Sequence, residues 1–333
     1  MNWNDGYEAQ YYVTIVDADS WRDLQRFETE GGSVNKEPTN LMQSASLNLT
    51  DIPGEGELWI RVWLDARQEG DGAHEALFTG LMFTPEAKWN GIMKSYKADC
   101  YSVLKPAADI LLDKGWYAPA GSGASLVADL LSVGPAPVEY AENSPTLTNS
   151  IVAEHGETNL SMARKIAEAL GWRFRIKGDG TISVEPQGTE PVVTVDSLEN
   201  DVVELEITDR RDWFSCPNVF RATARDLTAV ARDDSEDSPL STVNRGREIW
   251  KEDANAKLND GESIAEYAQR RLKEEQSTSR RITYNRRFIP GVLPGDAIQI
   301  HYPAQNIDGV FRISSQQIEL GYAARTSEEV IEL

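Results

Sequence analysis

Near its C-terminal end the chain reads Arg286-Arg287-Phe288-Ile289-Pro290-Gly291-Val292-Leu293-Pro294-Gly295-Asp296 and then continues into two short β-rich segments. The first segment covers residues 297–302 and the second covers 309–320, and both partly alternate between apolar and polar residues. Proline and glycine favour the tight turn from which the first strand leaves. A Pro-Gly-Asp turn, a strand, a Gly-Val-Phe-Arg-Ile strand and an exit strand together predict the closing part of a β-barrel. Nothing in this stretch indicates catalysis.

The first hundred residues also consist mostly of strand-like segments, at 11–16, 44–49, 58–64 and 76–83. The clearest of them is 58–64, because its aliphatic residues share one face and its aromatic residues the other. The aliphatic face holds Leu58, Ile60, Val62 and Leu64, and the opposite face holds Trp59, Arg61 and Trp63. Several short strands with turn residues between them predict a sandwich or barrel over residues 1–103.

Helical patterns replace the strands in residues 104–190. Helices are predicted at 106–112, 126–131 and 161–170, and a β-hairpin with a Gly178-Asp179-Gly180 turn at 172–184. In the third helix Met162, Ile166 and Leu170 are spaced four apart and form one apolar stripe. Residues 104–190 are therefore predicted to be a mixed α/β insert.

Strands resume in residues 191–333. They are predicted at 192–195, 202–207 and 218–224, followed by one long helix at 263–277. The acidic run 233–238 is predicted to be a mobile loop. The fold class is thus a β-rich α+β protein: two β-barrel-like domains, at 1–103 and 191–333, flank the insert.

The composition limits the classes of function. With 33 basic and 54 acidic residues among 333, the net charge is −21. This charge argues against sequence-independent nucleic-acid binding and against binding to an anionic membrane surface. The two cysteines, Cys100 and Cys216, are expected to be buried thiols. No secretory signal and no membrane-spanning segment is found, so the chain is expected to fold in a cytoplasm.

No catalytic or metal-binding pattern stands out. The three histidines, His74, His155 and His301, are far apart, and a metal site needs ligands in register. Glu204 and Glu206 share one strand face, and two carboxylates could hydrolyse a glycan, but so acidic a chain supplies such pairs by chance. Phosphate-binding loops and nucleophile motifs are missing from the sequence. We therefore expect no enzyme activity, no cofactor and no metal.

Aromatic residues are the candidates for contact with partners, because aromatic side chains often carry binding energy at interfaces. Trp59 and Trp63 share one strand face. This face either meets another protein or packs inside the chain against the inserted helices, and the sequence does not separate the two. Phe78 and Phe311 are further interface candidates.

The order of these parts resembles the tail hub family of bacteriophages and related contractile injection devices. Three stretches carry the resemblance: Leu77-Phe78-Thr79-Gly80-Leu81, the helix and hairpin from Glu157 to Val184, and the terminal Pro294-Gly295-Asp296 with Gly309-Val310-Phe311-Arg312-Ile313. The resemblance implies that the two β-barrel domains are tail-tube-like. It also implies a structural baseplate hub, a homotrimeric ring that links the tail tube protein to a tip or spike protein. It also implies a place in the virion tail after assembly in the host cytoplasm.

The same resemblance implies a channel that passes DNA or the tape measure protein without binding DNA specifically. An acidic channel wall would repel DNA and so prevent it from sticking. The alternative function is a cell-wall-degrading or glycan-binding tail tip protein, and a third is an unrelated β-rich enzyme. A hub is expected to form a trimer, so light scattering would separate it from a hydrolase.

Overall fold

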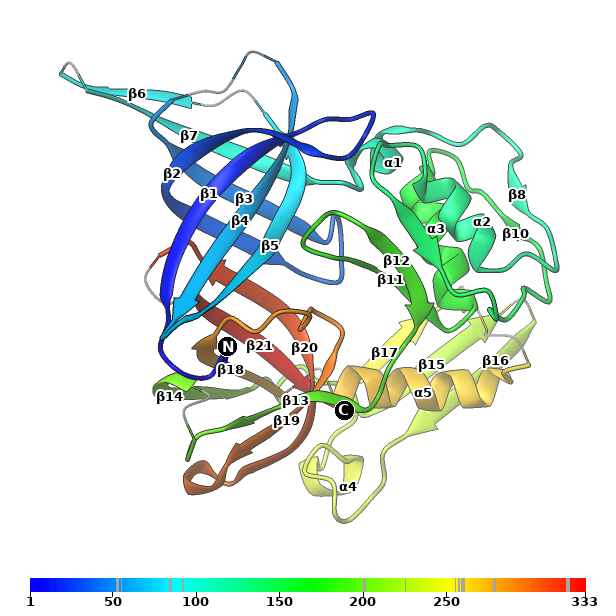
Figure 1. The fold of residues 1–333 in the computed structure, drawn as a ribbon. Helices are drawn as coiled ribbons and strands as arrows, with labels where there is room; N and C mark the ends of the chain where they lie inside the picture. Colours follow the sequence, from blue (N-terminus) through cyan, green and yellow to red (C-terminus); the bar gives the residue numbers. More distant parts are fainter. Residues whose placement is uncertain are drawn as a thin grey trace.

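The computed structural model describes residues 1–333 except 52, 53, 55, 84, 85, 92, 200, 201, 225, 255, 257, 259, 260, 278, 279, 322 and 323. Strand is the commonest secondary structure in the chain, and thirteen strands form one continuous sheet. Three smaller sheets lie outside it, and the helices gather on one side of the molecule (Figure 1). The predicted β-rich α+β class is confirmed.

The N-terminal strands close into a ring. In sheet order the ring is β1 (Glu8–Val16), β4 (Leu58–Gln68), β5 (Asp71–Met82), β7 (Met93–Ser102), β3 (Gln43–Leu49) and β2 (Asp23–Lys36). The ring closes because β2 also pairs with β1. Its interior is filled by the predicted aliphatic face of 58–64, since Ile60, Val62 and Leu64 are fully buried in one core. β6 (Glu86–Asn90) pairs with β7 outside this ring.

The C-terminal strands form a curved but open set. Their order is β13 (Pro191–Asp196), β19 (Ala297–Tyr302), β20 (Ile307–Glu319), β21 (Arg325–Glu332), β18 (Arg280–Arg287) and β14 (Val202–Arg211). A short 3-10 turn, η1 (Pro303–Gln305), joins β19 to β20. They enclose a second core that includes Ile298, Phe311 and Val330. Among the described residues no pairing joins β13 to β14, so a second closed barrel is not seen.

Strands β2 and β20 join the two sets because each changes its partner along its length. The first part of β2 pairs with β1, and its last residues, Ser33–Lys36, pair with Gln316–Glu319 of β20. The change in β2 falls at Gly31 and Gly32, where the pairing with β3 shifts register. Gly32 has φ +143°, and a Cβ there would lie 2.1 Å from the carbonyl oxygen of Ser46. Only glycine fits this close crossing of two strands.

Gly32→Ala is therefore expected to reduce the free energy of unfolding by about 1–3 kcal/mol through backbone strain, with a steric clash in addition. Urea denaturation measures the change. Gly72→Ala is the matched control, because Gly72 has no positive φ and the nearest atom to its Cβ would be 3.5 Å away. Equal stability of the two variants would contradict this role for Gly32.

The insert has its own core and contacts both strand sets. Its elements are α1 (Lys105–Asp109), β8 (Tyr117–Ala118), α2 (Ala124–Leu131), β9 (Val138–Tyr140), β10 (Ile151–Val152), α3 (Asn159–Ala169), β11 (Trp172–Ile176) and β12 (Ile182–Pro186). Thr158 caps α3 by accepting a hydrogen bond from the Ser161 backbone N–H, which fixes where the helix begins. The core extends in sequence from Val103 to Val184.

The turn between β11 and β12 rests on the N-terminal ring. The Asp179 carbonyl oxygen accepts hydrogen bonds from the Trp21 indole N–H and an Arg61 guanidinium N–H, both at 3.0 Å. The neighbouring Gly178 carbonyl accepts one from Thr79 Oγ1 at 2.8 Å. A Cβ at Gly178 would lie 1.7 Å from the Ala76 carbonyl oxygen, so the predicted Gly-Asp-Gly turn is also the point of closest approach to the ring.

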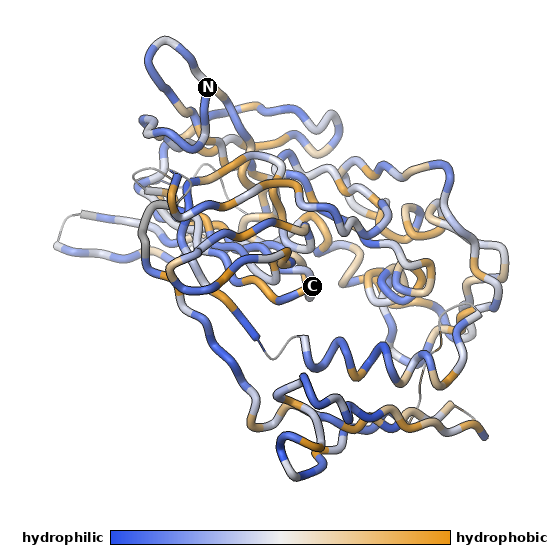
Figure 2. Tube along the Cα trace, turned by 90° about the horizontal axis from the view of Figure 1, so that it is seen from below, coloured by the Kyte–Doolittle hydropathy of each residue, from blue (hydrophilic) through white to orange (hydrophobic). Residues whose placement is uncertain are grey.

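A fourth unit lies between β14 and β18 in the sequence. It consists of β15 (Val219–Ala224), β16 (Leu227–Arg232), α4 (Thr242–Arg245), β17 (Trp250–Asp253) and α5 (Ile264–Ser277). We call residues 213–277 the side module. Its helix α5 covers a three-stranded sheet around a small core with Phe220 and Leu272. Figure 2 shows the side module apart from the main sheet, so the range 191–333 contains more than one packed unit.

The acidic run 233–238 belongs to the side module. Asp233 Oδ2 accepts hydrogen bonds from Ser238 Oγ at 2.6 Å and from Gln276 Nε2 at 3.0 Å. Thr242 Oγ1 donates to Asp234. The run lies outside helices and strands as expected, and its mobility stays a prediction.

Candidate interface surfaces

The outer face of the main sheet carries a continuous area of uncharged polar residues. These are Ser44 and Ser46 on β3, Ser33 and Asn35 on β2, Ser315 and Gln317 on β20, Ser327 on β21, and Thr283 and Asn285 on β18. Strand register places Asn35 beside both Ser44 and Gln317, and Gln317 beside Ser327. We call this area the polar face.

The polar face crosses both strand sets because β2 and β20 are neighbours. A groove of about 610 Å³ lies over it, between these strands and the segment 40–42. One row of directly paired residues carries no charge: Ser44, Asn35, Gln317, Ser327 and Asn285. Beside this row, Glu319 lies opposite Ser33, and Glu329 lies between Ser315 and Thr283. A quarter of the chain is charged, 26%, so five strands with so little charge between them form a distinctive surface.

A two-stranded arm extends from the ring. Among the described residues, strand β6 pairs with β7 alone, all five residues of β6 are exposed, and Figure 1 shows the arm projecting from the barrel. Trp89 is 67% exposed on the arm, with the Lys94 ammonium 5.0 Å from its ring centre. The outer edge of β6 leaves backbone N–H and C=O groups open to another strand. An exposed tryptophan on an open strand edge is a typical contact surface.

Of the residues predicted to contact partners, two are buried in cores. Phe78 is 0% exposed in the core of the N-terminal ring, and Phe311 is 2% exposed in the second core. Their rings therefore pack inside the chain and present no surface to a partner. Aromatic character alone does not separate a core position from a surface position.

The two tryptophans on β4 have different surroundings. Trp59 packs against the core of the insert, with its ring centre 5.6 Å from that of Trp21. Trp63 stacks on His74 at 4.0 Å and donates a hydrogen bond to Thr14 Oγ1 at 3.2 Å. Of the two alternatives for this strand face, Trp59 therefore shows packing inside the chain against the insert. A partner contact through the partly exposed Trp63 stays a prediction.

The histidines lie in three separate places. His74 Nδ1 is 2.5 Å from Asp65 Oδ1, His301 Nδ1 is 3.4 Å from Asp308 Oδ2, and His155 lies in an exposed turn. Within the described ranges no three His, Cys, Asp or Glu side chains are arranged to hold a metal ion. Glu206 is exposed on β14, and the side chain of Glu204 lies outside the described residues.

Both cysteines are buried free thiols, as predicted. Burial is also the main reason why the pKa of Cys100 is raised above its usual range. No helix in the described part of the chain is long and apolar enough to cross a bilayer.

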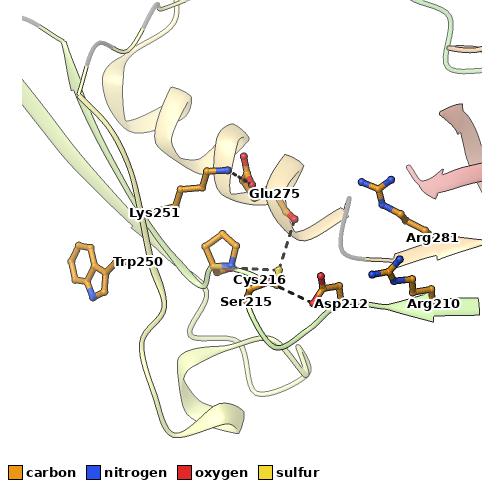
Figure 3. A pocket seen from close by; sticks show the side chains of 9 residues that line it. Arg210, Asp212, Ser215, Cys216, Trp250, Lys251, Glu275 and Arg281 are labelled. Atoms are coloured by element: carbon orange, nitrogen blue, oxygen red, sulfur yellow. Dashed lines mark hydrogen bonds and ion pairs between the residues drawn. The ribbon is translucent and has the colours of Figure 1, made fainter. Parts of the chain in front are cut away.

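A charged cleft of about 580 Å³ lies where the side module meets the main sheet (Figure 3). It is lined by Arg210, Asp212, Ser215, Cys216, Pro217, Trp250, Lys251, Glu275 and Arg281. Lys251 and Glu275 form an ion pair at 2.6 Å across the side module. The sequence gives no sign of this cleft, because its walls come from strands and a helix that are far apart along the chain.

The chain is similar in structure to several tail proteins. The tail protein from Neisseria meningitidis MC58 matches with 18% identity and a TM-score of 0.71, over 98% of this chain and 97% of that chain. The 43 kDa tail protein of prophage MuSo2 from Shewanella oneidensis matches with 13% identity and a TM-score of 0.67, over 97% and 98%. No protein-family model and no curated protein sequence matches the chain.

A third similar structure comes from a secretion system. The E. coli c3393 protein matches with 10% identity and a TM-score of 0.54, over 96% of this chain and 76% of that chain. It is described as a component of the type VI secretion system with structural similarity to the T4 bacteriophage tail proteins gp27 and gp5. The resemblance to phage tail proteins is therefore confirmed at the level of the fold.

Proposed function

We propose that the chain is a structural adaptor in the tail of a phage-like particle, a hub that links the tail tube protein to a tip or spike protein. The observation that supports this most is the polar face, because one row of it crosses both strand sets without a charged residue. Three chains arranged with this face inward would form a ring around a channel. Two strand sets per chain would then present six similar units to a tail tube.

The chemistry of the polar face suits the wall of such a channel. Serine, asparagine and glutamine hold a layer of water but carry no charge, so they neither attract nor strongly repel a polyanion. DNA or a tape measure protein could therefore pass without being held. We expected an acidic wall for this role from the net charge. A wall of mostly uncharged polar residues, with Glu319 and Glu329 among them, serves the same purpose.

The particle itself tests the adaptor role. Electron microscopy of intact particles is expected to place the protein on the tail axis, in the virion, as a ring of three copies. Single copies on a fibre, or clearance of peptidoglycan in a zymogram, would instead support the cell-wall-degrading or glycan-binding alternative.

The arm is proposed to contact a neighbouring subunit in this ring or in the tail tube. Trp89→Ser is expected to leave the melting temperature of the isolated chain unchanged within about 2 °C, because an exposed side chain adds little to stability. The same variant is expected to abolish incorporation into particles, measured by complementation and electron microscopy.

Leu198→Ser is the matched control for the arm. Leu198 is also a large exposed apolar residue, at 72%, but lies outside the arm. Particles that assemble normally with Trp89→Ser would exclude the arm as an essential contact.

A further inference from the structure

The facing ends of β14 and β18 bring four arginines together in two opposed pairs. Arg211 lies directly opposite Arg280, and Arg210 lies directly opposite Arg281. Like charges on directly opposite residues of neighbouring strands destabilise a sheet. A carboxylate between the two guanidinium groups of a pair would offset their repulsion.

The first pair has this carboxylate within the chain. Asp209 Oδ2 is 3.0 Å from Arg211 Nη2, and Asp209 Oδ1 is 3.2 Å from Arg280 Nε. Partial burial alone would raise the pKa of Asp209, but the hydrogen bonds and charges of the two arginines outweigh it and lower this pKa. The carboxylate is thus held in its charged form between the two guanidiniums.

The second pair faces the charged cleft and has no equivalent carboxylate on its own strands. Arg281 reaches Glu329 at 2.7 Å on the next strand, whereas the guanidinium of Arg210 makes no ion pair or hydrogen bond within the described part of the chain. Asp212 also lines the cleft, where its carboxylate accepts a hydrogen bond from Ser215 Oγ at 3.5 Å, and among the described residues it forms no ion pair with Arg210. Figure 3 shows Arg210 and Arg281 side by side, across the cleft from the Lys251–Glu275 pair.

We infer that the cleft binds a carboxylate side chain of an acidic segment of a partner protein, between Arg210 and Arg281. Paired guanidiniums hold a carboxylate through charge-assisted, often bidentate hydrogen bonds. The cleft volume of about 580 Å³ has room for a short segment rather than a single ion. The inference rests on the proposed adaptor role, since it names the chemistry of one of the partners of the adaptor.

Exposed aromatic rings beside the cleft support a peptide as the ligand. Trp250 lines the cleft and is 48% exposed, and Phe214, which directly precedes Ser215, is 80% exposed. Arg247 lies over the Phe214 ring at 4.9 Å and Arg232 over the Trp250 ring at 5.4 Å. Arginine and aromatic side chains together are the residues most enriched at binding hot spots.

Nucleic acid fits this surface less well than an acidic peptide. Binding to a phosphate backbone depends on many cations that release counterions together. In the cleft Lys251 and Arg281 already pair with Glu275 and Glu329, and the chain as a whole has a net charge of −21. Among the described residues, Arg210 is the cleft arginine without an ion pair, and it lies beside Arg281, which is paired. This arrangement suits one carboxylate better than a row of phosphates.

Calorimetric titration of the full chain with a short synthetic peptide of alternating leucine and glutamate tests the inference. We expect saturable binding that weakens as salt is added, and no binding of the same peptide with glutamine in place of glutamate. Arg210→Gln is expected to lower the affinity at least about tenfold, the usual effect of losing one charge-assisted hydrogen bond. Arg22→Gln is the control, because Arg22 is also exposed but lies outside the cleft, in the loop before β2.

Absence of peptide binding would overturn the inference, and so would equal affinity in the Arg210→Gln and Arg22→Gln variants. Tighter binding of a DNA duplex than of the acidic peptide would also overturn it. Because Arg210 is exposed, its substitution is not expected to affect folding, and a thermal melt of each variant checks this. The titration uses the isolated chain, so its failure would leave the adaptor role, tested on particles, unaffected.

Discussion

Glu328→Gln is expected to lower the free energy of unfolding by about 3–5 kcal/mol, because it leaves the charge of Arg286 buried without its counter-charge. Both residues are essentially inaccessible, Arg286 at 0% and Glu328 at 1% exposure. Arg286 Nη2 donates to Glu328 Oε1 at 2.5 Å and Arg286 Nε to Glu328 Oε2 at 2.9 Å. Guanidinium denaturation of the wild type and the variant measures the loss.

Further hydrogen bonds surround this ion pair. Tyr284 Oη donates to Glu328 at 2.5 Å, and Gln316 Nε2 donates to it at 2.7 Å. Burial alone would lower the pKa of Arg286, but the Glu328 carboxylate outweighs it and raises this pKa. The Glu328 carboxylate therefore neutralises the buried charge of Arg286 and accepts the hydrogen bonds of its neighbours, which lets these polar groups lie in the core.

Two further variants check the explanation. Glu329→Gln removes the charge of the next residue, whose ion pair with Arg281 is partly exposed at both ends. This variant is expected to lower the free energy of unfolding by about 1 kcal/mol or less. The double variant Arg286→Met with Glu328→Leu removes both charges and is expected to recover much of the lost stability. A loss of stability as large in Glu329→Gln as in Glu328→Gln would contradict the account.

Charged residues at inward positions also explain why some strands could not be predicted from the sequence. β18 reads Arg-Arg-Ile-Thr-Tyr-Asn-Arg-Arg and β21 reads Arg-Thr-Ser-Glu-Glu-Val-Ile-Glu, and both alternate in burial. Because Arg286 and Glu328 occupy inward positions, the apolar alternation that marks a half-buried strand is broken. β2 is obscured by Gly31 and Gly32, which are needed where it changes partner.

Segments with regular periodicity are predicted well. The helices expected at 106–112, 126–131, 161–170 and 263–277 overlap α1, α2, α3 and α5, because apolar spacing and the residues that end a helix are local signals. The two strands after Pro294-Gly295-Asp296 are likewise found as β19 and β20. What local patterns do not give is pairing between strands that lie far apart in the sequence, such as β2 with β20.

The candidate surfaces are the least predictable part for the same reason. The polar face exists because β2 and β20 pair although they lie at opposite ends of the chain. Arg210 and Arg281 meet only because the side module loops out between their strands. Phe78 and Phe311 were plausible contacts by residue type, but their positions on inward strand faces bury them.

Asp296→Ala is expected to cost about 3–5 kcal/mol and to loosen the insert from the C-terminal strands, because Asp296 is the buried carboxylate between them. Asp296 is 2% exposed, and its carboxylate is 2.9 Å from Arg173 Nη2 and 3.2 Å from Arg175 Nη2, both on β11 of the insert. Its Oδ2 also accepts a hydrogen bond from the Leu293 backbone N–H at 2.9 Å, which shapes the Pro-Gly-Asp turn.

More positive charge lies around this carboxylate. Lys36 is 5% exposed, and burial, together with the charge of Arg175, lowers the pKa of its ammonium to about 8. Burial and the charge of Arg173 likewise lower the pKa of Arg312. Without Asp296, the partly exposed Glu185 would be left as the shared partner of Arg173 and Arg175.

Chemical denaturation gives the total loss in Asp296→Ala, and amide hydrogen exchange shows where it acts. Exchange is expected to rise in β11, β12 and the turn before β19, and to change little in the N-terminal ring. Glu139→Gln is the control, because Glu139 pairs with Lys177 of the same hairpin but both are about half exposed, so its loss is expected to be about 1 kcal/mol or less. If exchange in β11 and β12 stayed unchanged in Asp296→Ala, the turn would not be what holds the insert in place.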